Sequence, residues 1–140
     1  MDNEKSISVL LVDDETDFVE PVAFWLKSRK YNVTTARNGR EAIQKIKDDL
    51  PDIVFMDINM PGMNGLEALK NIRTFDKTLP VIMVTAAYSN ERYVDKANEL
   101  GIAGFFAKNY TFDQLVEMIH MTLKRHKQLQ PSAKQQEQKT

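Results

Sequence analysis

Acidic residues stand directly after two short apolar segments of the chain, where together they could hold a cation. Asp13 and Asp14 follow residues 7–12, and Asp57 follows residues 53–56. Carboxylate oxygens with room for water suit Mg²⁺, or Mn²⁺ in its place. Each acid alone is weak evidence, because acids are common at the start of a helix and interact favourably with its dipole. A cation site therefore requires the two segments to end side by side.

A hydroxyl and an ammonium group follow two further apolar segments. Thr85 comes directly after residues 81–84, and Lys108 comes shortly after residues 102–106. A metal ion and an ammonium group can neutralise the oxygens of a phosphoryl group during its transfer, while a hydroxyl donates a hydrogen bond to it. A carboxylate can be the covalent acceptor. If these groups lie together, they indicate phosphoryl transfer to Asp57.

The elements that must position these groups alternate along the chain. Short apolar segments rich in β-branched residues predict strands. They are residues 7–12, 31–35, 53–56, 81–84 and 102–106. The segments between them have helical spacing, and the last one carries a single apolar stripe. The stripe consists of Phe112, Leu115, Val116, Ile119 and Leu123.

Strict alternation of strands and helices predicts an α/β fold with an open, doubly wound parallel sheet covered by helices on both faces. Five strand–helix units are too few for a closed barrel. In such a sheet ligands bind at the carboxyl ends of the strands. The fold therefore predicts that edge as the place of Asp13, Asp14, Asp57, Thr85 and Lys108.

Helix starts carry capping signals, in which a side chain accepts a hydrogen bond from a free backbone N–H group. The pairs are Asn38 with Glu41, Asn64 with Glu67 and Thr111 with Gln114. Pro21 conflicts with this pattern, because proline inside a helix removes a backbone hydrogen bond. The first helix is therefore expected either to begin near residues 19–20 or to have a kinked first turn.

Composition excludes several classes of function. The chain has 140 residues and no cysteine, which excludes disulfides, thiolate zinc sites and cysteine nucleophiles. Its formal net charge of -1 argues against direct binding of nucleic acid. No signal peptide or membrane span is evident, so a cytoplasmic protein without membrane contact is expected. Residues 1–128 are predicted to form one domain, and residues 129–140 a disordered polar tail or the start of a linker.

Four motifs in order resemble the response-regulator receiver domains of two-component signalling. They are VLLVDDE (9–15), DINMPGMNGLE (57–67), VIMVTAA (81–87) and GFFAK (104–108). The resemblance covers nearly the whole chain and implies a flavodoxin-like (βα)5 sheet with the strand order 2-1-3-4-5. It also implies a signalling switch that catalyses its own phosphorylation and dephosphorylation, rather than an enzyme acting on an external substrate.

The resemblance also implies a role for each site residue. Asp57 matches the phosphoacceptor. Asp14 and Asp57 would bind Mg²⁺ directly, Asp13 through water, and Asn59 through its backbone carbonyl. Lys108 would pair with the phosphoryl group, or with Asp57 when that carboxylate is free.

Other matching positions would convert phosphorylation into a signal. Thr85 would bond to the phosphoryl group and shift inward, and Phe105 matches the aromatic residue that rotates between exposed and buried positions. Ala86 matches the small residue beside the phosphoryl site, while Ala87 and Asn59 match positions that set how fast the phosphate is lost. The surface of the fourth helix, fifth strand and fifth helix would change.

Asn109 departs from the family pattern. Most members have proline after this lysine, joined through a cis peptide bond. A cis bond before a residue other than proline costs about 2.5–4 kcal/mol, so a trans bond is expected between Lys108 and Asn109. The departure removes no acid, hydroxyl or ammonium group from the predicted site.

Partners and alternatives follow from the same residues. The phosphoryl donor implied is a sensor histidine kinase or a histidine phosphotransfer protein, with a homodimer as one outcome of phosphorylation. The chain would act alone or as part of a longer regulator. A haloacid-dehalogenase-like phosphatase is disfavoured, because Asn59 stands where that family has a second acid. A nucleotide- or flavin-binding domain is disfavoured because Asp13, Asp14 and Glu15 replace a glycine-rich phosphate loop.

Overall fold

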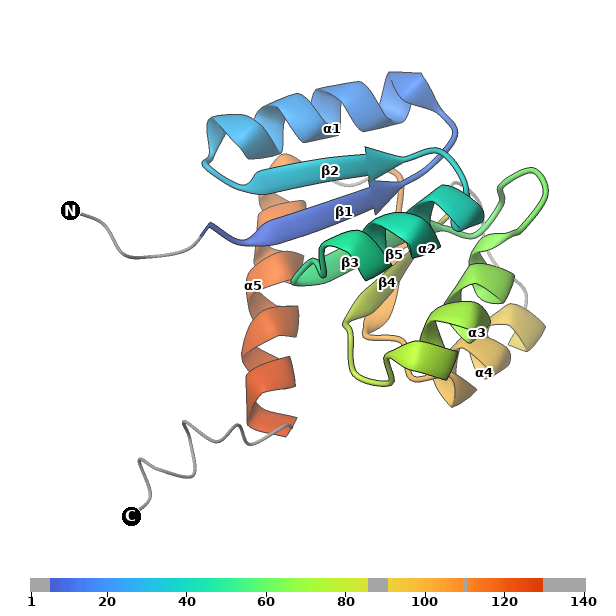
Figure 1. Cartoon of the computed structure of the whole chain (residues 1–140). Coiled ribbons are helices and arrows are strands. Elements are labelled where there is room, and N and C mark those ends of the chain that lie inside the picture. Colours follow the sequence, from blue (N-terminus) through green and yellow to red (C-terminus); the bar gives the residue numbers. More distant parts are fainter. Residues whose placement is uncertain (1–5, 86–90, 110, 130–140) are drawn as a thin grey trace, which may run out of the picture.

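Strands and helices alternate along the whole described part of the chain (Figure 1). The computed structural model describes residues 6–85, 91–109 and 111–129. The strands are β1 (Ser8–Val12), β2 (Asn32–Ala36), β3 (Ile53–Asp57), β4 (Val81–Thr85) and β5 (Gly104–Ala107). The helices are α1 (Thr16–Ser28), α2 (Gly39–Asp48), α3 (Gly65–Phe75), α4 (Glu91–Glu99) and α5 (Phe112–Leu129).

The strands form one parallel sheet in the order β2-β1-β3-β4-β5. This confirms the predicted doubly wound fold and its strand order. The direction of winding reverses between β1 and β3, so the connections that leave these two neighbouring strands run to opposite sides. A crevice at such a point is the usual ligand site of an open α/β sheet.

Alternate residues of the strands face two separate hydrophobic cores, because successive side chains of a strand point to opposite faces. Leu10, Val54 and Met83 belong to the core beneath α2, α3 and α4. Leu11 and Phe55 belong to the core beneath α1 and α5. The central strand β3 is buried along its full length, as its continuous apolar sequence predicts.

The predicted helix caps are present at three helices. Asn38 accepts a hydrogen bond from the Glu41 N–H group at α2, and Asn64 and Glu67 form a reciprocal capping box at α3. Thr111 and Gln114 also exchange hydrogen bonds between side chain and backbone at the start of α5. These local contacts fix where the chain turns from strand to helix.

Pro21 lies inside α1, which begins at Thr16. The expectation of a start near residues 19–20 was therefore wrong. Packing of the apolar face of α1 outweighs the one backbone hydrogen bond that proline removes. The buried residues of that face are Val19, Val22, Ala23 and Leu26.

The carboxyl-terminal part of the described chain contains two further tested features. The peptide bond between Lys108 and Asn109 is trans, as predicted, since residues 6–85, 91–109 and 111–129 contain no cis bond. Helix α5 ends at Leu129, one residue into the segment predicted as a polar tail, and residues 130–140 lie outside the described ranges. No helix in those ranges is long and apolar enough to cross a membrane.

Candidate functional site

Three acids meet where β1 and β3 end. Asp13 and Asp14 follow β1, and Asp57 is the last residue of β3. One carboxylate oxygen from each lies within 4.8 Å of the others. Asp13 and Asp57 are buried, whereas Asp14 is exposed. The parallel sheet thus assembles the acid cluster from residues far apart in sequence, as predicted.

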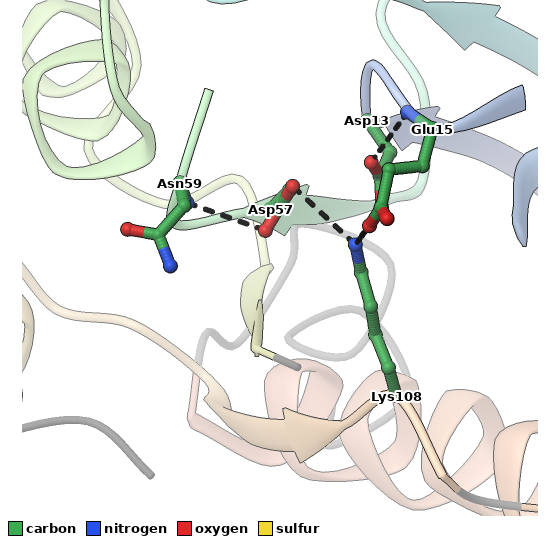
Figure 2. Close-up of polar contacts among 5 residues, drawn as sticks. All are labelled: Asp13, Glu15, Asp57, Asn59 and Lys108. Atoms are coloured by element: carbon green, nitrogen blue, oxygen red, sulfur yellow. Dashed lines mark hydrogen bonds and ion pairs between the residues drawn. The ribbon is translucent and has the colours of Figure 1, made fainter. Parts of the chain in front are cut away.

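The side chain of Lys108 extends to this acid cluster from the carboxyl end of β5. It follows β5, and its backbone N–H group donates to the Thr85 carbonyl oxygen at 2.9 Å. Its Nζ atom lies 2.8 Å from Asp13 Oδ2 and 3.5 Å from Asp57 Oδ2. The ammonium group therefore lies among the buried acids, nearer to Asp13 than to the predicted partner Asp57 (Figure 2).

Glu15 is a third partner of Lys108, and the sequence did not predict this contact. Its Oε1 atom forms an ion pair with Lys108 Nζ (Figure 2). Glu15 also donates its backbone N–H group to Asp13 Oδ1 at 2.9 Å. The only signal in the sequence was its place as the third acid in succession. The direction of its side chain depends on where α1 begins.

Burial and charge together set the protonation of the site. Burial and the nearby charge of Asp13 raise the pKa of Asp57 from 3.8 to about 6, although Lys108 and the Asn59 N–H group oppose the rise. Burial alone would lower the pKa of Lys108. Its polar contacts with Asp13 and Glu15, together with the charges of Asp57 and Asp13, raise that pKa overall. Lys108 therefore stays protonated, and its single positive charge does not balance the negative charges of the acids around it.

The acid cluster fits a divalent cation. Asp13 Oδ2 is buried and accepts no hydrogen bond from the described residues, and its 2.8 Å contact with Lys108 Nζ is an ion pair. A buried carboxylate oxygen without a hydrogen bond is costly, and a metal ion would offer it a ligand bond or a bound water. Three carboxylates with one exposed member leave room for water ligands. This donor set suits Mg²⁺ or Mn²⁺.

The other predicted site residues surround this cluster. The Asn59 N–H group donates to Asp57 Oδ1 at 3.2 Å, and its side chain is exposed and directed away from Lys108 (Figure 2). Thr85 ends β4, beside β3, and is half-buried. Phe105 is partly buried against the core beneath α3 and α4. Ala86 and Ala87 lie outside the described residues.

The loop after Asp57 approaches the acceptor closely. The Gly65 N–H group donates to the Ile58 carbonyl oxygen at 2.9 Å. A Cβ atom at Gly65 would lie 2.4 Å from the Asp57 carbonyl oxygen and 2.9 Å from Ile58 Cα. Only glycine allows α3 to begin this close to the end of β3.

The family comparison agrees with this geometry. A model of the response regulator receiver domain matches residues 9–120. This chain belongs to that family. The receiver domain is a signalling switch of two-component systems, and the predicted family resemblance is confirmed.

Individual relatives support the same assignment. The receiver domain is 35% identical over 120 residues to the sensory transduction protein RegX3 of Mycolicibacterium smegmatis, covering 84% of this chain and 51% of RegX3. It is 33% identical over 111 residues to the transcriptional regulatory protein ZraR of Klebsiella oxytoca, covering 79% of this chain and 25% of ZraR. The chain therefore spans about half or less of the length of these two curated relatives.

Solved structures match over most of the chain. The chemotaxis protein CheY4 of Vibrio cholerae superposes with a TM-score of 0.79 at 30% identity, covering 84% of this chain and 99% of CheY4. A CheY-like receiver domain protein of Methanospirillum hungatei superposes with a TM-score of 0.84 at 24% identity. That match covers 90% of this chain and all of the other, and it supports the fold alone.

Proposed function

We propose that this receiver domain accepts a phosphoryl group on Asp57 from the phosphohistidine of a sensor histidine kinase or a histidine phosphotransfer protein. The carrying observation is the placement of Asp57 beside Asp13, Asp14 and Lys108 at the carboxyl edge of the sheet. An acceptor carboxylate, a candidate cation site and a fixed ammonium group are the parts that phosphoryl transfer to an aspartate requires.

Each group of the chain has a defined part in the transfer. An Asp57 carboxylate oxygen forms a bond to phosphorus as the P–N bond of the phosphohistidine breaks. The histidine nitrogen keeps the electron pair of that bond and takes a proton. Lys108 donates to a phosphoryl oxygen, and the Asn59 N–H group, already directed at Asp57 Oδ1, holds the acceptor in place. Bound Mg²⁺ would be held by Asp14 and Asp57, by Asp13 through water and by the Asn59 carbonyl group, and it would neutralise phosphoryl charge.

The phosphoryl group would then change a distant surface. Thr85 ends the strand next to Asp57 and precedes the segment that leads to α4, so a bond from its hydroxyl to the phosphoryl group would draw that strand end inward. Phe105 packs on the α4 side of β5, where it would follow this movement. The surface of α4, β5 and α5 would thereby recognise a partner protein or a second copy of the chain.

Intact-mass spectrometry with acetyl phosphate tests the proposal. We expect one phosphoryl adduct on the wild-type protein, formed only with Mg²⁺ or Mn²⁺ and absent from Asp57→Asn. Asp49→Asn is the matched control, because Asp49 is an exposed acid at the end of α2 and away from the cluster. The proposal fails if the wild type gains no adduct and binds no beryllofluoride, or if Asp57→Asn gains the adduct in equal yield.

A further inference from the structure

Glu15 occupies the N-cap position of α1 without capping the helix. Its side chain accepts no hydrogen bond from the first turn, although N-cap side chains commonly do so. It turns instead across the strand ends and forms an ion pair with Lys108 (Figure 2). The Glu15 side chain is 59% exposed, whereas the side chains of Asp13 and Asp57 are 3% and 4% exposed. Glu15 is thus the outermost of the three acids around Lys108.

The ammonium group of Lys108 contacts all three of these acids. An ammonium group has three N–H donors, and three carboxylates lie within ion-pair distance of Nζ. The Phe18 ring, also on α1, lies 5.0 Å from Nζ and favours the same side. The distance of 3.5 Å to Asp57 Oδ2 is longer than the 2.8 Å to Asp13 Oδ2. Asp13 and Glu15 therefore hold Lys108 more closely than the acceptor Asp57 does.

A phosphoryl group on Asp57 needs at least one of these three donors. Asp13 is buried within the candidate cation site, and Asp57 carries the new group, so neither can move away at little cost. Glu15 can, because its carboxylate is largely in contact with water. Transfer of Lys108 to the phosphoryl group therefore requires the Glu15 contact to break.

We propose that Glu15 is a positioning residue that competes with the phosphoryl group for Lys108 and so restrains phosphorylation of Asp57. The inference rests on the proposed phosphoryl transfer and deepens it by naming the contact that must be exchanged. Replacement of Glu15 by glutamine would release Lys108 and leave the acceptor and the cation ligands in place.

Phosphorylation rates with acetyl phosphate and Mg²⁺ test the competition. An exposed ion pair contributes little, so we expect Glu15→Gln to accelerate adduct formation about two- to fivefold. Glu15→Asp keeps the charge but shortens the side chain, and it should behave like Glu15→Gln. Asp17→Asn is the matched control: Asp17 is an exposed acid in the first turn of α1 and forms none of the ion pairs of Lys108. It should leave the rate within the spread of wild-type measurements.

Lysine labelling provides a readout that needs neither metal nor phosphoryl donor. An amine-reactive reagent, quantified by peptide mass spectrometry, should modify Lys108 faster in Glu15→Gln than in the wild type and Asp17→Asn. In a Lys108→Met background, Glu15→Gln should no longer change the phosphorylation rate, because the two side chains act through one contact. A persistent acceleration there would overturn the inference.

The outcomes separate this inference from the proposed function. A wild type that gains no phosphoryl group would overturn both. If the wild type is phosphorylated, two results would overturn this inference and leave the proposed function standing. Either Glu15→Gln slows phosphorylation or leaves its rate unchanged, or Asp17→Asn accelerates it as much as Glu15→Gln does. Unchanged labelling of Lys108 in Glu15→Gln would also overturn it, because Glu15 would then not hold the ammonium group.

Discussion

Two cations are held at opposite ends of the sheet in different ways. At the carboxyl end, Lys108 lies among three carboxylates. At the amino end, the Arg73 guanidinium donates to the carbonyl oxygens of Leu100, Asp76 and Gly101 at 2.7, 3.0 and 2.9 Å. Arg73 thereby ties the end of α3 to the segment between α4 and β5.

The difference separates a structural contact from an exchangeable one. Burial lowers the pKa of Arg73, and the charge of Asp76 partly opposes this shift. The hydrogen-bond partners of Arg73 are neutral backbone carbonyl groups, whose charge does not change. The carboxylate partners of Lys108 repel one another, and a divalent cation could take the place of its ammonium group among Asp13 and Asp57. We therefore expect loss of the Arg73 side chain to affect stability alone, and loss of a charged side chain around Lys108 to affect chemistry with smaller effects on stability.

The largest loss of stability should come from a substitution at Gly65, whose backbone lies against the end of β3. Gly65→Ala places a Cβ atom 2.4 Å from the Asp57 carbonyl oxygen, and backbone must move to admit it. We expect a loss of about 3 kcal/mol in the free energy of unfolding, measured by urea denaturation. Gly104→Ala is the control, because no atom of the described residues lies within 4 Å of its added Cβ atom. Equal stability of the two variants would contradict the close approach.

Removal of the Arg73 contact should be the next largest effect. Arg73→Met leaves three carbonyl groups without their donor and should cost about 2 kcal/mol in unfolding free energy. Amide hydrogen exchange should rise around Leu100 and Gly101, while the phosphorylation rate stays unchanged. Lys70→Met, on the exposed face of α3, is the control for loss of charge. The distinction between the two ends breaks down if Arg73→Met blocks phosphorylation without loss of stability.

Asp57→Asn should stabilise the metal-free protein. The pKa of Asp57 is about 6 in the folded protein, against 3.8 for the free carboxyl group. The stabilisation from the neutral carboxyl group is therefore complete below pH 3.8 and is lost as the pH rises through 6. At pH 8 the variant should exceed wild type by about 1–2 kcal/mol, and the gap should shrink by about 1 kcal/mol at pH 5. Urea denaturation with a chelator measures both values. A gap independent of pH would contradict the assigned cause.

The smallest effect concerns cation affinity at the carboxyl end. Lys108→Met removes a positive charge that competes with a divalent cation for Asp13 and Asp57. We expect Mg²⁺ to bind about three- to tenfold more tightly by calorimetric titration, while phosphorylation slows and the switch is lost. Weaker Mg²⁺ binding in Lys108→Met would mean that the ammonium group organises the acids instead of opposing the cation.

The sequence predicted the carboxyl end far better than the amino end. The period of apolar residues located every strand, and parallel strands must bring their following residues to one edge. Asp13, Asp57 and Lys108 could therefore be placed together from the order of elements alone. The contacts of Arg73 had no such signal, because its partners are backbone carbonyls 27 and 28 residues away and an adjacent turn. Any residue type supplies a carbonyl group, so composition does not mark them.

Side-chain direction marks the limit of prediction at the site itself. Pro21 predicted either a later start of α1 or a kinked first turn, and the later start was wrong because tertiary packing carries the helix back to Thr16. Glu15 lies directly before that start, and its side chain contacts Lys108. The acids and the lysine followed from topology. Which of the three acids lies nearest to the Lys108 ammonium group depends on interatomic distances, and these cannot be deduced from the spacing of residues in the sequence.

Chemical mapping of the phosphoryl group tests the central claim most directly. After incubation with acetyl phosphate and Mg²⁺, borohydride reduction converts an aspartyl phosphate to homoserine, and peptide mass spectrometry locates the changed residue. We predict homoserine at position 57 in the wild type, and at no position in Asp57→Asn or in wild type treated without a divalent cation. Homoserine at position 13 or 14, or an adduct that resists reduction, would contradict Asp57 as the acceptor.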